Sequence, residues 1–324
     1  MRRRLALILA LLFMLAACSS EPADEPTPAP EETTAAEAAF PRTVQVPAGA
    51  ESEAQEVQIQ AEPQRVAALT YETAALVAEL GAGERLVMVP AEAANPVLSD
   101  DPETMEGVEH HIASESAVDA EAVLAADPDL VILTDRHGLE EGVGQVLSEA
   151  GIPVLTLPNT FSSSEDMMTN IDLVATALGT EQAGTDLAQT LEAGLADESD
   201  PEGPRVLVLS NQAGRPFVTA GAAFPLEVVR LAGGQDASES LGMVRSGPIT
   251  AEQVLAAEPD RILLVDMNGS GEAIFTELLQ NPAVADLPAV ADHEVLLLEG
   301  KYVQALGLTS TIEGREQIAE WLDR

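Results

Sequence analysis

The sequence contains a single cysteine, Cys18, among its 324 residues. Without a second cysteine, no disulfide can form within the chain. A metal cluster held by several cysteine thiolates is excluded for the same reason. Any large α/β structure predicted below must therefore be held together by packing, and its chemistry cannot depend on paired thiols.

Positive charge is scarce as well. The chain has 15 Lys and Arg residues against 55 Asp and Glu, for a formal net charge of −40, and Lys301 is its one lysine. A nucleic-acid partner needs a basic face, so this composition excludes one. The same acidity disfavours adhesion to anionic lipid. Each arginine close to a predicted ligand site therefore becomes conspicuous.

Catalytic signatures are missing. The sequence has no Gly-x-Ser-x-Gly elbow, no phosphate loop and no Gly-x-Gly-x-x-Gly after its first predicted strand. It has four histidines and no His-rich loop, whereas a zinc or manganese site needs three or four converging ligands. We therefore expect a binding protein without a catalytic cofactor, not an enzyme, and a Zn or Mn carrier is a weaker alternative.

The amino end has the pattern of an export signal. Three arginines, Arg2 to Arg4, precede an apolar run from Leu5 to Ala17 that is too short to span a bilayer. Leu15-Ala-Ala-Cys18 resembles the bacterial lipobox, which implies cleavage before Cys18 and its lipidation. An ordinary signal with an incidental cysteine is the alternative. We expect a signal peptide at 1–17 and a lipid anchor facing the extracellular or periplasmic side.

A segment rich in Glu, Ala, Pro and Thr follows the signal. Such a composition cannot bury enough apolar surface to offset its ordering entropy, so residues 18–61 are expected to form a disordered acidic tether. Alternating apolar residues between Phe40 and Gln60 leave an edge strand or a hairpin open as an alternative. A surface adhesin would account for an anchor and a tether but not for the repeat described next.

An internal repeat indicates two lobes of one design. Residues 118–133 read VDAEAVLAADPDLVIL and residues 249–264 read ITAEQVLAAEPDRILL, identical at nine of sixteen positions. In each copy an N-cap residue, Asp119 or Thr250, begins a short helix, a Pro-Asp pair ends it, and an apolar strand follows. Helices alternating with short strands favour parallel sheets. The fold class expected is α/β with two Rossmann-like lobes.

The expected division places an N-terminal lobe at 62–163 and a C-terminal lobe at 199–324. Between them, residues 164–198 have helical composition and no strand candidate. We interpret them as a single long helical spine between the lobes. Gly179 and Gly184 mark the place for a break or junction within it.

These segments resemble the class III substrate-binding proteins of bacterial ABC importers, which carry ferric siderophores, haem, cobalamin and some metals. The resemblance is carried by Arg65-Val-Ala-Ala-Leu-Thr, by Ala78-Glu-Leu-Gly-Ala-Gly-Glu-Arg-Leu-Val, and by both Ala-Glu…Pro-Asp copies. It implies a monomer that binds its ligand in a groove between the lobes and docks on a permease dimer driven by an ATPase. It also implies docking roles for Glu121 and Glu252, although both residues are equally good first-turn helix residues.

Within that family the haem-binding subgroup is the most similar. Its members carry an iron-ligating Tyr or His in the loop before the first repeat copy, where this chain has His110 and His111. A tyrosine found in relatives before the second copy is replaced by Ser246. Haem is therefore the expected ligand, and a ferric siderophore or cobalamin is the alternative.

Five further residues are predicted to line the groove because they follow expected strands or precede the second repeat. A surface ion pair is the competing reading for each arginine, and a packing role is the competing reading for each tyrosine. These residues are Arg136, His137, Arg245, Tyr71 and Tyr302.

Overall fold

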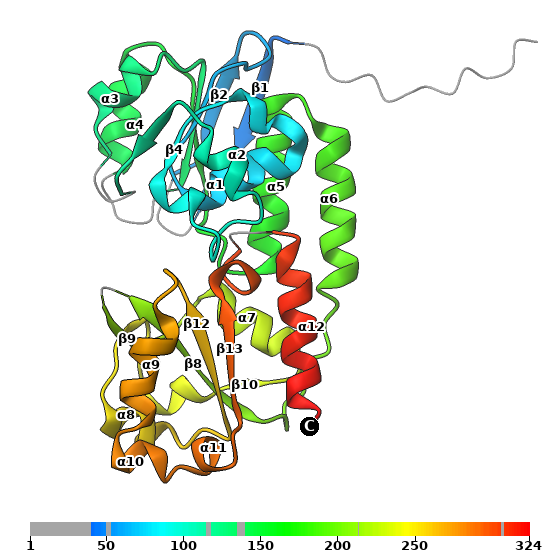
Figure 1. The fold of residues 1–324 in the computed structure, drawn as a ribbon. Helices are drawn as coiled ribbons and strands as arrows, with labels where there is room; N and C mark the ends of the chain where they lie inside the picture. Colours follow the sequence, from blue (N-terminus) through cyan, green and yellow to red (C-terminus); the bar gives the residue numbers. More distant parts are fainter. Residues whose placement is uncertain (1–39, 50–52, 115–117, 135–139, 213, 306–307) are drawn as a thin grey trace, which may run out of the picture. The chain divides into compact units, whose positions relative to one another are not determined.

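Two β-sheets, one on each side of residues 164–194 in the sequence, form the framework of the computed structural model (Figure 1). The model describes residues 40–49, 53–114, 118–134, 140–212, 214–305 and 308–324, and residues from Glu37 onward belong to one compact unit. The part built around the first sheet is called lobe one and the part built around the second is called lobe two. The α/β fold class is confirmed.

The first sheet is entirely parallel, with its strands in the spatial order β5-β4-β3-β6-β7. The central strands are buried along their whole length, as expected for a sheet covered by helices on both faces. Its strands are β3 (Val66–Ala68), β4 (Leu86–Pro90), β5 (His110–Ile112), β6 (Leu130–Thr134) and β7 (Val154–Leu157).

The second sheet is mixed, which corrects the expectation of parallel sheets. Its order is β11-β9-β8-β12-β13, with β10 beside β8, and both β9 and β11 run antiparallel to their neighbours. The chain turns back directly after β8 through Gly214, whose φ of 75° suits glycine. Its strands are β8 (Arg205–Gln212), β9 (Arg215–Val218), β10 (Gln235–Asp236), β11 (Gly247–Pro248), β12 (Arg261–Asp266) and β13 (Val295–Glu299).

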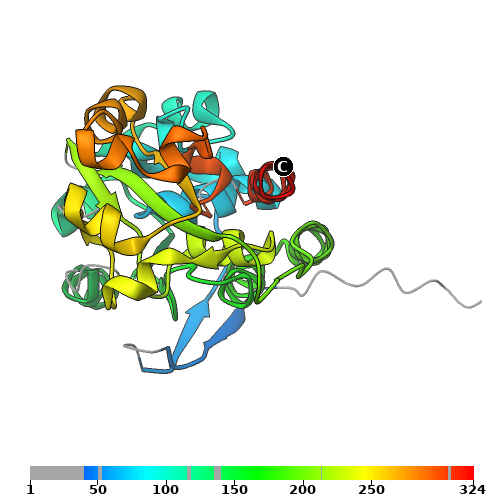
Figure 2. The ribbon, with the colours of Figure 1, turned by 90° about the horizontal axis from the view of Figure 1, so that it is seen from below.

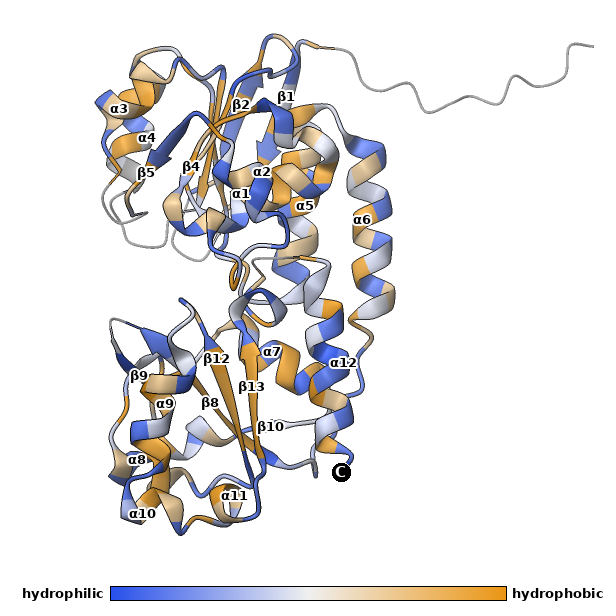
Figure 3. Ribbon diagram, in the orientation of Figure 1, coloured by the Kyte–Doolittle hydropathy of each residue, from blue (hydrophilic) through white to orange (hydrophobic). Residues whose placement is uncertain are grey.

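Helices cover both sheets and create three apolar cores. One core extends through both lobes, and the other two lie within lobe two and lobe one respectively. Figure 3 shows the strands β8, β12 and β13 of the second sheet as largely hydrophobic. The principal helices are α1 (Tyr71–Val77), α2 (Pro102–Glu106), α3 (Ala120–Ala125), α4 (Glu140–Glu149), α7 (Phe224–Leu231), α8 (Ala251–Ala257), α9 (Gly271–Leu279), α10 (Pro282–Ala285), α11 (Pro288–Ala291) and α12 (Ser310–Leu322).

The repeated Pro-Asp pair has the same structural role in each lobe. The carboxylate of Asp129 accepts a hydrogen bond from the amide of Arg65 at 2.9 Å, and that of Asp260 accepts one from the amide of Arg205 at 2.9 Å. Each arginine side chain donates to carbonyl groups at the end of the repeat helix, α3 or α8. In lobe one these hydrogen bonds join the start of β3 to the end of α3. In lobe two they join the start of β8 to the end of α8.

The segment between the sheets consists of two helices, which corrects the expectation of a single spine. These are α5 (Ser164–Leu178) and α6 (Glu181–Gly194). Gly179 ends α5 with a left-handed φ of 77°, and the chain turns so that α6 packs against α5. Gly184 permits that packing, because a Cβ there would lie 2.5 Å from the Cβ of Ala175.

Part of the segment 18–61, which was predicted to be a disordered tether, forms regular secondary structure. An antiparallel hairpin, β1 (Arg42–Val46) with β2 (Gln55–Ile59), lies within the segment 18–61 and packs against α5. The side chain of Arg42 lies over the ring of Phe40, donates to the carbonyl of Thr176 and pairs with Glu181. The buried side of the hairpin consists of Val44, Val46, Val57 and Ile59. The hairpin alternative is therefore the correct one for residues 42–46 and 55–59.

Helices α6 and α12 are both seen end-on in Figure 2. Gly194 of α6 contacts Ile312 of α12 closely, since a Cβ on the glycine would lie 2.5 Å from that side chain. No helix in the described ranges has the length and apolar character needed to cross a bilayer.

Candidate functional site

The carboxyl ends of parallel strands are where α/β folds hold ligands. In lobe one this edge carries Tyr71, the first residue of α1, which is half-buried directly after β3. Thr134, the last residue of β6, is fully buried there, and within the described residues its hydroxyl has no hydrogen-bond partner. The edge of lobe one therefore combines an aromatic ring with an unsatisfied hydroxyl group.

The two histidines predicted to bind iron lie in a strand, not in a loop. His110 and His111 are the first two residues of β5, which pairs with β4 at the edge of the sheet. Nε2 of His111 lies 2.9 Å from the carbonyl oxygen of Met105, and Nε2 of His110 lies 3.7 Å from a carboxylate oxygen of Glu109. Side chains of successive strand residues point to opposite faces of the sheet, so at most one of the two imidazoles can coordinate the same bound iron.

Three of the predicted residues fall outside the described part of the chain. Arg136 and His137 lie in the segment 135–139 that follows β6, and Cys18 lies in the segment 1–39. Their predicted roles remain predictions.

In lobe two, a buried asparagine organises the carboxyl edge. Asn211, near the end of β8, donates from Nδ2 to Oδ1 of Asp266 at 2.9 Å and to Oδ1 of Asn268 at 2.8 Å, and it accepts the amide of Met267 at 2.6 Å. The amides of residues 268, 269 and 271, together with Asn211, hold the pKa of Asp266 below its usual value, despite partial burial that raises it. The loop between β12 and α9 is thereby fixed in place.

Two arginines of lobe two, apart from Arg324 at the end of the chain, have guanidinium groups without a polar partner among the described residues. Among the described residues, Arg215 and Arg245 form neither an ion pair nor a hydrogen bond through their guanidinium groups, although the chain is rich in carboxylates. Arg215 begins β9, opposite the last residue of β8, and lies 5.3 Å from the ring centroid of Phe217. Sequence reasoning missed it because β9 had not been predicted.

Arg245 precedes β11 and is exposed. The neighbouring Ser246 accepts a hydrogen bond at Oγ from the amide of Ala220, and Gly221 lies so close to Val244 that a Cβ would meet its carbonyl oxygen at 2.3 Å. The loop before β11 is therefore packed tightly against the loop after β9. Among the described residues, no hydrogen bond or ion pair joins Arg245 to another predicted site residue.

Tyr302 follows β13 in a short helical turn, η6 (Gly300–Tyr302), where it is half-buried beside Lys301. The two docking candidates, Glu121 and Glu252, are both exposed in the first turns of α3 and α8. The N-caps predicted for these helices, Asp119 and Thr250, are confirmed, since each accepts a backbone amide at its side-chain oxygen.

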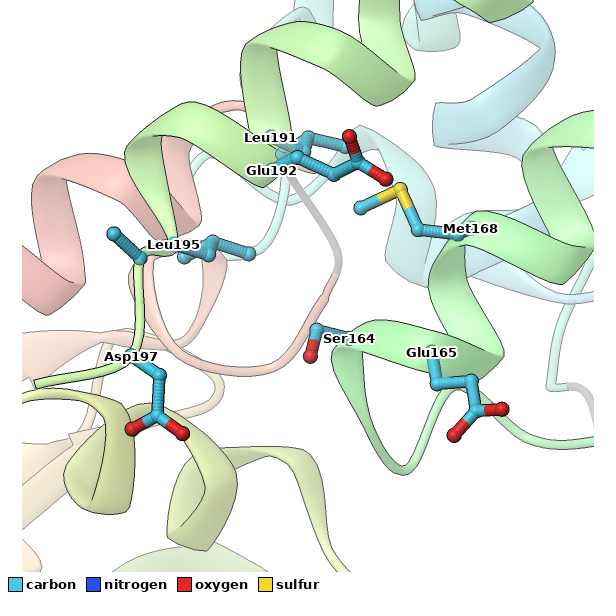
Figure 4. A pocket seen from close by; sticks show the side chains of 8 residues that line it. Ser164, Glu165, Met168, Leu191, Glu192, Leu195 and Asp197 are labelled. Atoms are coloured by element: carbon cyan, nitrogen blue, oxygen red, sulfur yellow. The ribbon is translucent and has the colours of Figure 1, made fainter. Parts of the chain in front are cut away.

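Neither of two pockets that open in the described region is lined by a predicted residue. The larger, of about 790 Å³, has Ser162, Asp200, Arg230 and Asp236 among its walls. The smaller, of about 430 Å³, opens between the start of α5 and the end of α6 (Figure 4). Within the described part of the chain, no group of three or more His, Cys, Asp or Glu side chains is placed to hold a metal ion.

Residues 66–302 match the family described as periplasmic binding protein, and the chain therefore belongs to that family. It is accordingly a solute-binding protein, not an enzyme. No curated protein matches the chain at a significant level.

Solved structures share the fold. The periplasmic haem-binding protein RhuT of Roseiflexus sp. RS-1, in apo form, is 26% identical, with 80% of this chain and 98% of that chain covered and a TM-score of 0.65. The periplasmic haem-binding protein HutB of Vibrio cholerae is 23% identical over 81% and 99%, with a TM-score of 0.63. Staphylococcus aureus SirA, complexed with staphyloferrin B, is 18% identical over 87% and 98%, with a TM-score of 0.65.

Proposed function

We propose that this protein captures an iron complex, haem in the first instance, between the carboxyl edges of its two sheets and delivers it to an ABC permease. The observation that carries the proposal is membership of the periplasmic binding protein family together with the likeness to structures described as haem-binding proteins. His110 or His111 is the proposed axial ligand from lobe one.

The free arginines support an anionic ligand. A guanidinium group without a carboxylate partner, in a chain with 55 Asp and Glu residues, is available for a negatively charged guest. Haem carries two propionates, and Arg215 and Arg245 are proposed to pair with them from lobe two. Arg136, His137, Tyr71 and Tyr302 complete the proposed ligand-binding set.

A ferric siderophore is the second candidate, favoured by the likeness to SirA in complex with staphyloferrin B. Such complexes are also anionic, so the same arginines would serve. Cobalamin is a further possibility within the same fold. A directly bound zinc or manganese ion receives no support from the described residues, where no cluster of ligands exists.

Delivery is proposed to use the two exposed glutamates. Glu121 and Glu252 occupy the same position of the two repeat copies, so they offer a matched pair of acids to arginines of a permease dimer that an ATPase drives. Lipidation at Cys18 would hold the monomer to the outer face of the cell membrane through the acidic segment before the hairpin.

The test is an absorption titration of residues 37–324, the compact unit, with haemin. A saturable, shifted Soret band is expected, and it should disappear in one of the two variants His110→Ala and His111→Ala and persist in the other. Exposed His293 supplies the control: it has a φ of 63°, so His293→Asn preserves its conformation and should leave the band unchanged.

Arg215→Ala and Arg245→Ala should each weaken haemin binding by roughly tenfold or more, the effect of losing one charge-assisted hydrogen bond. No Soret change beyond that of free haemin would reject haem, and the same protein would then be titrated with ferric staphyloferrin B and cobalamin.

A further inference from the structure

In the described part of the chain, hydrogen bonds join lobe one directly to lobe two outside α5 and α6. Glu79, in the helical turn η1 (Ala78–Ala82), accepts the amide of Thr309 at 3.2 Å, and Thr309 is the N-cap residue of α12. The amide of Lys301 donates to the carbonyl of Val97 at 3.0 Å. These four residues, with Asp100, are called the interlobe junction.

The hydrogen bonds at Glu79 and at Val97 belong to one contact surface. Oγ of Ser310, at the start of α12, donates to the carbonyl of Lys301 at 2.8 Å and so ties the two donors of lobe two together. Gly300 lies against lobe one, because a Cβ there would approach Leu98 to 2.6 Å. A change in the contact between Glu79 and Thr309 is therefore expected to alter the packing of the start of α12 and of Lys301 against lobe one.

The Glu79 carboxyl group is half-buried, and in the described residues no cation is paired with it. Burial raises its pKa to about 7, and the carboxylate of Asp100 adds to the rise, while hydrogen bonds from Thr309 and Leu308 oppose it. The ammonium group of Lys301 lies 3.2 Å from Glu299 instead.

The other charged groups on elements packed against η1 do not compensate Glu79. They have partners of their own, lie in solvent, or sit elsewhere on their helices. On α1, η2 and α6 they are Glu181 with Arg42, Asp186 with Gln182, Arg85 with Glu62, exposed Glu84, buried Glu72 in the first turn of α1, and Glu192 in the pocket at the far end of α6. In the first half of α12 they are exposed Glu313 and Arg315, which pairs with Glu198.

We propose that the contact between Glu79 and Thr309 is a proton-controlled junction between the lobes, closed while Glu79 is protonated and weakened when it ionises. A neutral carboxyl group tolerates burial beside Asp100 and still accepts the amide of Thr309. An ionised one is better hydrated in water, so it favours states in which η1 and α12 separate. The inference does not depend on which ligand the protein binds.

Hydrogen exchange of the ligand-free compact unit, residues 37–324, tests this between pH 5 and 8.5. The amides of the first turn of α12 should lose protection as the pH rises through about 7, by tenfold or more after correction for intrinsic exchange. Glu79→Gln keeps the shape and the acceptor oxygen but cannot ionise, so its protection should stay constant.

Two further variants sharpen the result. Asp100→Asn removes the neighbouring negative charge. Because the carboxylate of Asp100 raises the pKa of Glu79, its loss should lower that pKa and move the loss of protection to lower pH. Glu84→Gln, at an exposed acid nearby, should behave as the unsubstituted protein. A flat profile in the unsubstituted protein, or a pH-dependent one in Glu79→Gln, would overturn the proposal.

Discussion

Asn211 shows how much a single buried side chain contributes to the edge of lobe two. Its amide group donates to a side-chain oxygen of Asp266, the last residue of β12, and to one of Asn268 in the loop that follows, and its own oxygen accepts a hydrogen bond from the amide of Met267. The side chain is fully buried, so water cannot replace these partners. A loop in a ligand-binding position is thereby held by a residue of the neighbouring strand.

Asn211→Ala is expected to lower the free energy of unfolding by about 1–3 kcal/mol, because the amide of Met267 and the carboxylate of Asp266 lose buried partners. Urea denaturation of residues 37–324 measures the loss. Gln212→Ala, one residue further along and exposed, should change stability by less than about 0.5 kcal/mol. Equal losses in the two variants would contradict the role given to Asn211.

At the scale of helices, the packing of α5 on α6 depends on a missing side chain. Gly184 lies where a Cβ would be 2.5 Å from the Cβ of Ala175, a distance that forces the helices apart. Gly142, inside α4, has nothing within 4 Å of the same atom. Replacing each glycine by alanine therefore adds a methyl group to a crowded helix interface at Gly184 and to open space at Gly142.

Gly184→Ala is expected to destabilise the protein by up to about 2 kcal/mol, since overpacking outweighs the gain in helix propensity. Gly142→Ala should instead stabilise it by about 0.5–1 kcal/mol, because only the propensity gain applies. Melting temperatures of the two variants should move in opposite directions. A shared direction would show that α5 and α6 adjust freely.

The elements that sequence predicted well are those with local signals. The repeat helices have N-caps at Asp119 and Thr250, and the strands after them are continuous apolar runs, so both were predictable. The antiparallel β9 was not, because its four residues carry no alternation of their own and pair only after the chain turns at Gly214. Missing β9 also meant missing Arg215, the residue that begins it.

At the scale of the whole molecule, Glu79 links stability to pH with a definite sign. Its pKa is about 7 in the folded protein against an ordinary value of 4.5, so the folded state binds more protons than the unfolded state between these values. The free energy of unfolding therefore falls as the pH rises through this window. The stabilising effect of the proton is fully present below the lower value and lost above the higher one.

Comparing the protein with Glu79→Gln isolates this effect from those of the other carboxyl groups. The difference in unfolding free energy between the two should change by about 2–3 kcal/mol between pH 5 and pH 8, in favour of the glutamine variant at the higher pH. Urea denaturation at both pH values gives the difference directly. If the unfolding free energies of the unsubstituted protein and of Glu79→Gln changed with pH in parallel, Glu79 would have an ordinary pKa in the folded protein. The contact between Glu79 and Thr309 would then not be controlled by protonation near pH 7.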